Sequence, residues 1–125
     1  MQTFATLQEF EKATGHIPYR LNASGVTYET SKYQKNRRNE EWLYTYYAYE
    51  DGLIVTTQIW NIASGINVLT NDSYQLYTTG TGSEVYYSTD KIDGSTYALT
   101  QLNDSVLMVS ADSAVPLERV LQIFK

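Results

Sequence analysis

The stretch WLYTYYAYEDG, residues 42–52, joins a dense aromatic run to a turn signal and predicts a β-hairpin. Successive side chains of a β-strand point to opposite faces, so residues 42–49 are predicted to present two different faces. One face carries Trp42, Tyr44, Tyr46 and Ala48, and the other carries Leu43, Thr45, Tyr47 and Tyr49. Asp51 and Gly52 then suit the positive φ angles of a tight hairpin turn, and residues 53–60 return as the partner strand.

Tyrosine suits either face of such a sheet, because its ring packs while its hydroxyl reaches water or a polar partner. Cross-strand aromatic pairs contribute about 0.2–1 kcal/mol each relative to Ala pairs, so many of these rings need no ligand. The chain has twelve Tyr, however, and an open aromatic face that stacks on a glycan, a peptide or a lipid is the alternative. The residues assigned to such a ligand or partner surface are Tyr47, Tyr49, Trp60 and Tyr86.

Outward from this hairpin, the N-terminus predicts a helix over residues 6–14. Thr6 and Glu9 have the spacing of a capping box, and apolar residues recur at helical spacing behind them. Gly15 stands where a left-handed C-cap is expected, and Pro18 prevents the helix from resuming. A second short helix is predicted at the C-terminus, with Pro116 in its first turn and a buried stripe made by Leu117, Val120, Leu121 and Phe124.

Between the helices, alternating segments and turn residues predict only strands and loops, with a polar loop at 35–41. The segments with strand-like patterns are 26–33, 42–49, 53–60, 66–70, 73–79, 84–89, 95–101 and 105–110. The expected fold is α+β, a curved antiparallel sheet of about six or seven strands with the N-terminal and C-terminal helices packed on one face. Residues 1–125 are expected to form a single domain.

Composition excludes several classes of protein. The net charge of −5 argues against a protein that tracks a nucleic-acid backbone. The absence of cysteine excludes disulfides, a thiol nucleophile and a Cys-based zinc site. No stretch approaches the ~20 apolar residues that span a bilayer, and the first ten residues lack a signal-peptide pattern. The chain is thus either cytoplasmic or a soluble piece of an anchored protein, and the Tyr-, Thr- and Asn-rich composition favours the second.

Candidate catalytic groups are sparse, and we expect no catalytic residue, metal or cofactor. His16, the one histidine, has no second His or Cys to form a metal site and follows a helix end, where a cation is favoured. Acidic pairs stand at Glu40–Glu41, Glu50–Asp51 and Asp90 with Asp93. They fall in predicted loops and turns, where carboxylates serve turn geometry. A basic group formed by Lys32, Lys35, Arg37 and Arg38 is interpreted as a solvated loop, with contact to an anionic surface as the alternative.

Four stretches together resemble an uncharacterised bacterial domain. They are FATLQEFEKATGHIP (4–18), GSEVYYS (82–88), STYALTQ (95–101) and PLERVLQIF (116–124). The domain recurs in Gram-positive bacteria as the extracytoplasmic part of anti-sigma-factor-like membrane proteins and of lipoproteins. The resemblance spans most of the chain and implies a sensing or interaction module outside the membrane. The family has no assigned catalytic residues, so the resemblance implies no site.

The predicted function is therefore a non-enzymatic extracytoplasmic sensory or interaction domain of a bacterial envelope protein, with an unknown envelope ligand or protein partner. The full-length protein would be membrane-anchored, and no nucleic-acid partner is expected. A glycan- or lipid-binding module that uses exposed aromatic side chains is the first alternative. A small enzyme with helices around a pocketed sheet is the second, and it requires a buried, perturbed carboxylate or histidine.

Overall fold

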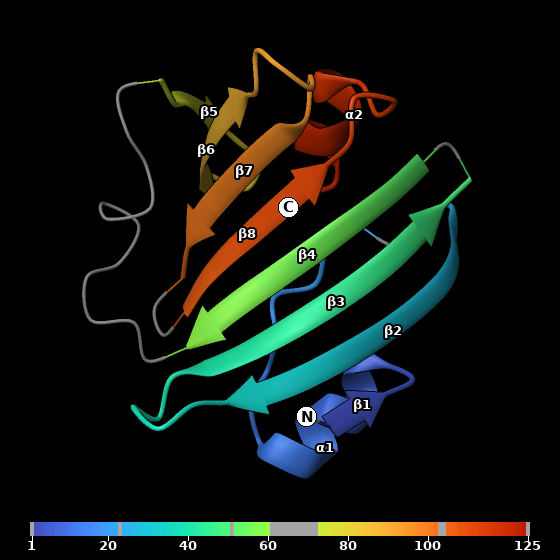
Figure 1. Ribbon diagram of the computed structural model, residues 1–125, viewed down its shortest axis with the longest axis vertical. Helices are drawn as coiled ribbons and strands as arrows, with labels where there is room; N and C mark the ends of the chain where they lie inside the picture. The colour runs from blue at the N-terminus through green and yellow to red at the C-terminus, as the bar shows by residue number, and fades with distance from the viewer. Residues whose placement is uncertain (1, 23, 51, 61–72, 103–104, 125) are drawn as a thin grey trace.

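A single antiparallel sheet and two short helices make up the computed structural model, which describes residues 2–22, 24–50, 52–60, 73–102 and 105–124 (Figure 1). The strands are β1 (Gln2–Phe4), β2 (Val26–Lys35), β3 (Glu41–Tyr49), β4 (Gly52–Trp60), β5 (Gln75–Thr78), β6 (Glu84–Thr89), β7 (Thr96–Gln101) and β8 (Ser105–Ala111). The helices are α1 (Leu7–Thr14) and α2 (Leu117–Gln122). In the described part of the chain, neither helix is long and apolar enough to cross a membrane.

The strand order β1-β2-β3-β4-β8-β7-β6-β5 shows two four-stranded meanders joined side by side. Strands β4 and β8 form the seam, with Ile54 opposite Ala111 and Trp60 opposite Ser105. Every neighbouring pair is antiparallel, which confirms the predicted α+β class and the antiparallel sheet.

The sheet has eight strands, so the expected count of six or seven is wrong. One missed strand is β1, which spans three residues and is too short to show alternation. It pairs with β2 at the edge of the sheet, with Thr3 opposite Lys32. The predicted strand at 66–70 lies outside the described residues.

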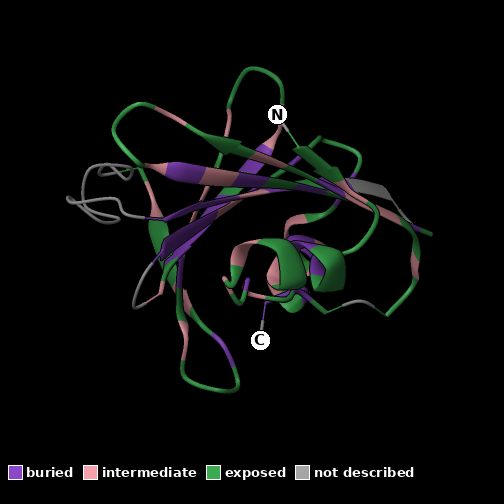
Figure 2. Cartoon of the chain, turned by 90° about the horizontal axis from the view of Figure 1, so that it is seen from below, coloured by how far each residue is buried: buried purple, intermediate pink, exposed green. Residues whose placement is uncertain are grey.

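The two helices lie on the same side of the sheet, and the sheet bends around them (Figure 2). We call the side that faces the helices the inner face and the opposite side the outer face. Helix α1 contacts β1 and β2, and α2 contacts β7. The inner face holds one apolar core that includes residues from both helices, from β3 and from β8.

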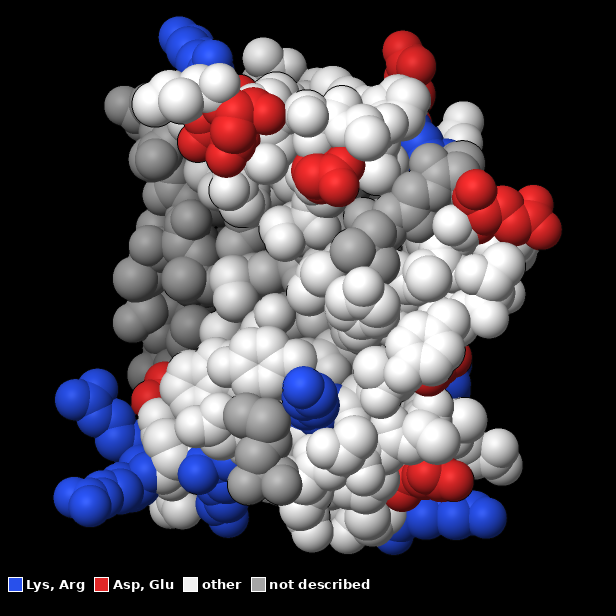
Figure 3. Space-filling view, turned by 45° about the vertical axis from the view of Figure 1, so that its right-hand side comes forward, with Lys and Arg blue, Asp and Glu red and all other residues white. Residues whose placement is uncertain are grey.

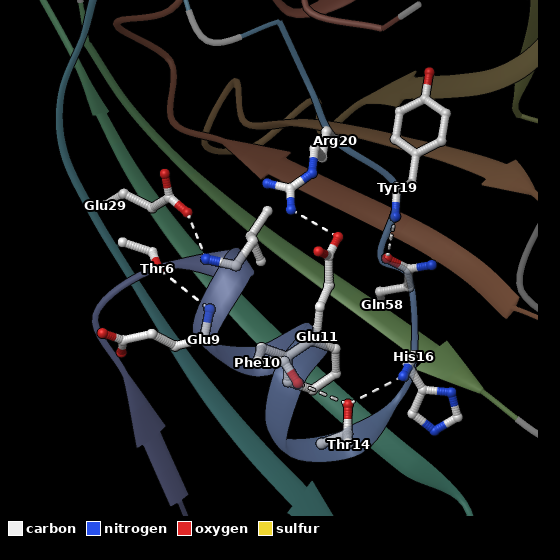
Figure 4. A network of polar contacts seen from close by, with 11 residues as sticks. Thr6, Glu9, Phe10, Glu11, Thr14, His16, Tyr19, Arg20, Glu29 and Gln58 are labelled. Atoms are coloured by element: carbon white, nitrogen blue, oxygen red, sulfur yellow. Dashed lines mark hydrogen bonds and ion pairs between the residues drawn. The ribbon is translucent and has the colours of Figure 1, made fainter.

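Helix α1 begins and ends as its sequence predicts. The hydroxyl of Thr6 accepts a hydrogen bond from the Glu9 N–H, and Gly15 takes the left-handed C-cap conformation. The Glu9 carboxylate accepts a hydrogen bond from the N–H of Ala5, one residue before Thr6, whose N–H is the donor in a standard capping box. A second carboxylate comes from the sheet, because Glu29 on β2 accepts from the Leu7 N–H (Figure 4). The start of α1 is thereby tied to the inner face.

The segment after α1 crosses the inner face and joins the two helices through the core. The Tyr19 N–H donates to the side-chain oxygen of Gln58, a buried residue of β4 (Figure 4). The Asn22 N–H donates to the carbonyl of Ile123 near the chain end, 2.8 Å away. The Tyr49 hydroxyl donates to the carbonyl of Asn22, so β3 is bound to the same segment. Leu21 is buried between these bonds.

Helix α2 begins at Leu117, so Pro116 occupies its N-cap position rather than the first turn that the sequence predicts. Val120, Ile123 and Phe124 are buried in the core. The guanidinium of Arg119 lies over the ring of Tyr49, 4.8 Å from its centroid. A helix this short is marginal alone, so its stability comes from these contacts.

Phe10 is the central anchor of α1, and we predict that Phe10→Ala destabilises the fold severely. Its ring is fully buried and lies 5.6–5.7 Å from the rings of Phe4, Tyr33 and Trp60. Removing such a ring costs about 3–5 kcal/mol of unfolding free energy, which urea denaturation measures. Ile17→Ala, at a side chain that is 80% exposed, is the control and should change stability little. An equal loss of unfolding free energy in the two variants would contradict the central position of Phe10 in the core.

Candidate functional site

Three of the four residues predicted to form a ligand surface lie in the core, so the assignment is wrong for those three. Tyr47, Tyr49 and Trp60 are 4%, 5% and 1% exposed. They project from β3 and β4 on the inner face, under the helices. Tyr86 is partly buried on the outer face, where it packs beside Leu99.

Helix docking decides which face is covered. The predicted division of β3 into two faces is confirmed, since Leu43, Tyr47 and Tyr49 are buried whereas Tyr44 and Tyr46 are exposed. The alternation by itself does not say which set meets the helices. Only the tertiary structure places α1 and α2 over the Leu43 side.

The exposed aromatic residues are instead on the outer face. Tyr28 of β2, Tyr44 and Tyr46 of β3 and Tyr97 of β7 are 57%, 36%, 37% and 39% exposed. The rings of Tyr28 and Tyr46 meet edge to face, with their centroids 6.3 Å apart. In Figure 3 the described residues in the middle of the view include few charged groups, Asp and Glu lie mainly above them, and Lys and Arg lie mainly below. The outer face is the candidate functional site.

A shallow depression in the outer face has a volume of about 510 Å³ and lies over β2, β3 and β4. We call it the tyrosine trough, and its lining includes Tyr28, Thr30, Lys32, Tyr44, Tyr46 and Val55. Thr3 of the edge strand β1 closes one side. Aromatic rings, hydroxyl groups and one ammonium group thus line a single open surface, in the size range of small-molecule sites.

A second depression, about 270 Å³ in volume, adjoins the trough at Val55 and extends over β8 and β7. Its lining includes Thr57, Tyr74, Tyr97, Leu99 and Met108. Tyr74 packs on a small outer cluster formed by Leu99 and Val106. Burial, and to a smaller extent the nearby Tyr97, raise the pKa of the Tyr74 hydroxyl. The two depressions share Val55 in their linings.

A different polar cluster surrounds Trp60 at the inner face. The imidazole of His16 stacks on the Trp60 ring with centroids 4.8 Å apart, and its Nε2 contacts the Glu41 carboxylate. Lys35 lies 3.8 Å from the other oxygen of Glu41. Burial, the charge of Glu41 and a hydrogen bond to Glu41 raise the pKa of Tyr33. His16 is thus bound to the sheet, a role beyond the predicted one at the helix end.

This cluster offers a His–Glu pair, but its groups are already engaged with one another. Among the described residues, the buried indole N–H of Trp60 has no hydrogen-bond partner. No group of three or more potential metal ligands exists in the described ranges. We interpret the cluster as the anchor that holds the end of α1 on the sheet.

The other predicted charged groups are separated by the structure. Glu40 accepts from the Asn36 side chain in the β2–β3 turn. Asp90 accepts from two backbone N–H groups of the β6–β7 turn, and Asp93 accepts from a third. These carboxylates therefore serve turn geometry, as the sequence predicts. Glu50 is exposed, and Asp51 lies outside the described residues.

The basic group is divided by strand alternation. Lys32 lies on the outer face, opposite Tyr44 on β3, whereas Lys35 lies on the inner side with Glu41. Arg37 and Arg38 are exposed in the turn between β2 and β3. Only Lys32 of this group lines the tyrosine trough.

No protein-family model, curated protein or solved structure matches this chain. The resemblance to an extracytoplasmic bacterial domain therefore stays a prediction.

Burial of Tyr47 predicts a loss of stability in alkali. Desolvation, and to a smaller extent the charge of Glu29, raise the pKa of Tyr47, so its phenol stays neutral in the folded protein. In the unfolded chain the phenol ionises near pH 10. Stability is therefore complete below pH 10 and falls above it, by up to about 1.4 kcal/mol per pH unit for this group.

The variant Tyr47→Phe should lose less stability between pH 10 and pH 11.5 than the parent protein, as urea titrations at several pH values would measure. Tyr28→Phe, at an exposed ring, is the matched control and should keep the slope of the parent. A parental slope in Tyr47→Phe would show that this phenol is accessible to water.

Proposed function

We propose that this chain is a non-enzymatic binding domain of a bacterial envelope protein, and that it contacts its ligand or partner through the outer face of the sheet. The observation that carries the proposal is the set of exposed tyrosines on the face that the helices leave uncovered. Aromatic side chains combine a large contact area with few rotatable bonds, which makes them common in binding surfaces.

The geometry of the sheet supports a binding role. The outer-face side chains stand on paired strands whose registers run without interruption through β3, β4 and β8. Strand-borne groups are held more firmly than groups on loops, so a ligand pays less ordering cost. The exposed rings of Tyr44 and Tyr46 follow each other on one strand and present a continuous contact surface.

The proposed location outside the cytoplasm rests on the resemblance and on the composition rich in Tyr, Thr and Asn. A domain that binds an envelope component through a preformed surface is compatible with a sensing role. An aromatic face of this kind suits glycans, lipids and peptides.

Outer-face binding predicts that changing Tyr44 and Tyr46 to Ser together abolishes retention of the purified domain on envelope fragments from the bacterium that carries the gene. Loss of two aromatic contacts at the centre of a binding surface should weaken binding by up to about a thousandfold, because such residues contribute about 2 kcal/mol each. Co-sedimentation with the fragments measures the affinity.

The matched control changes Ile17 and Ile92 to Ser together. These side chains are 80% and 98% exposed and lie outside the outer face, in the segment after α1 and in the β6–β7 turn. Their loss should leave retention unchanged. Equal retention of both double variants, at equal folded stability, would refute a binding role for the outer face.

The predicted location can be tested on the native-length gene product in its own cells. We expect it in the membrane fraction, with this domain digested by protease added to intact cells. Digestion only after cell lysis would contradict the extracytoplasmic location, and a cytosolic marker protein controls for leakage.

A further inference from the structure

We infer that the tyrosine trough binds an acidic oligosaccharide, with Lys32 as the residue that contacts its anionic groups. This inference deepens the proposed function, on which it rests, by naming the class of ligand. It follows from the distribution of charge on the outer face and from the kinds of side chain that line the trough.

The part of the outer face made by β1–β4 carries one cation and no carboxylate among the described residues. Strand register places the following residues there: Thr3, Tyr28, Thr30, Lys32, Gln34, Trp42, Tyr44, Tyr46, Ala48, Val55, Thr57 and Ile59. The whole chain has 14 acidic and 9 basic residues, so a surface free of carboxylates departs from its average. An anion bound at this surface meets the ammonium group of Lys32 and no carboxylate of these strands among the described residues.

Lys32 is available to a ligand. Within the described residues it forms no ion pair, whereas Arg20 is paired with Glu11 and Lys35 with Glu41. Its exposed side chain lines the trough between Thr30 and the ring-bearing strand β3. The exposed Arg37 and Arg38 in the adjoining turn extend the positive charge beyond the end of β2.

The lining favours a sugar over a lipid. Three tyrosines and three threonines line the trough, and Val55 is its one aliphatic side chain among the described residues. Membrane-inserting surfaces instead present Leu, Phe or Trp beside their basic residues. A pyranose ring has apolar C–H faces and a hydroxylated rim, and such a ring suits surfaces whose aromatic residues carry polar tips.

The experiment titrates the domain with an oligogalacturonate, with its methyl-esterified form, with a heparin oligosaccharide and with phosphatidylglycerol vesicles, using calorimetry. At least one acidic oligosaccharide should bind, and the esterified form should bind about tenfold more weakly, because a hydrogen bond to a charged group is lost. Added salt should weaken the acidic ligands selectively.

Two single variants locate the contact. Lys32→Gln should reduce affinity for the acidic oligosaccharide about tenfold and leave the esterified form unchanged. Lys91→Gln removes an exposed cation from the β6–β7 turn, away from the trough, and should leave the affinity for both forms of the oligosaccharide unchanged. The double Ser variant at Tyr44 and Tyr46 should weaken both ligands.

The outcomes separate this inference from the proposed function. If no acidic oligosaccharide binds, or if Lys32→Gln binds it like the parent, the inference fails. The proposed function still holds in that case if the Tyr44 and Tyr46 variant loses envelope binding. Binding to vesicles alone, dependent on Lys32, would overturn the sugar assignment in favour of an anionic lipid. If the Tyr44 and Tyr46 variant binds the envelope like the parent protein, both proposals are wrong.

Discussion

The stacking of Phe10 and His16 against Trp60 determines which face of the sheet becomes the core. The Trp60 ring lies 5.6 Å from Phe10 and 4.8 Å from His16, so α1 and the residue after its C-cap contact β4 directly. Once α1 is docked there, the segment after it must cross the inner face towards α2. Every strand residue in register with Trp60 is then directed inwards, and its neighbours are directed outwards.

Two short helices cannot cover eight strands by themselves, and the structure fills the inner face in a second way. The segment over residues 15–22 lies between the helices, and its backbone groups bond to Gln58 and Ile123. Gln58 in turn donates to the hydroxyl of Ser105 on β8, which satisfies its buried amide. The outer face receives no such cover from the described residues. Its tyrosines shield the sheet partly while they keep their hydroxyl groups in water.

Local patterns predicted most elements but not the side of the sheet on which each ring lies. The helix caps, the two faces of β3 and the turn carboxylates depend on residues close in sequence, so they were predictable. The surface assignment of Tyr47 and Trp60 failed because burial depends on where α1 docks, a contact between residues far apart in the chain. Leu43 shares a face with Tyr47, and this apolar neighbour was the one available signal. The contact of His16 with Glu41 spans 25 positions and has no local signature.

The same alternation that divided the basic group also gives the trough its character. Lys35 is three residues after Lys32, an odd step along a strand, so one ammonium faces Glu41 and the other faces the tyrosines. A shift of one residue in the pairing of β2 with β3 would place Lys32 on the inner face and Glu29 on the outer one. Hydrogen bonds from Leu7 to Glu29 and from Thr30 to Phe4 oppose that shift. The contacts that hold α1 and β1 on the sheet therefore also keep the trough positive.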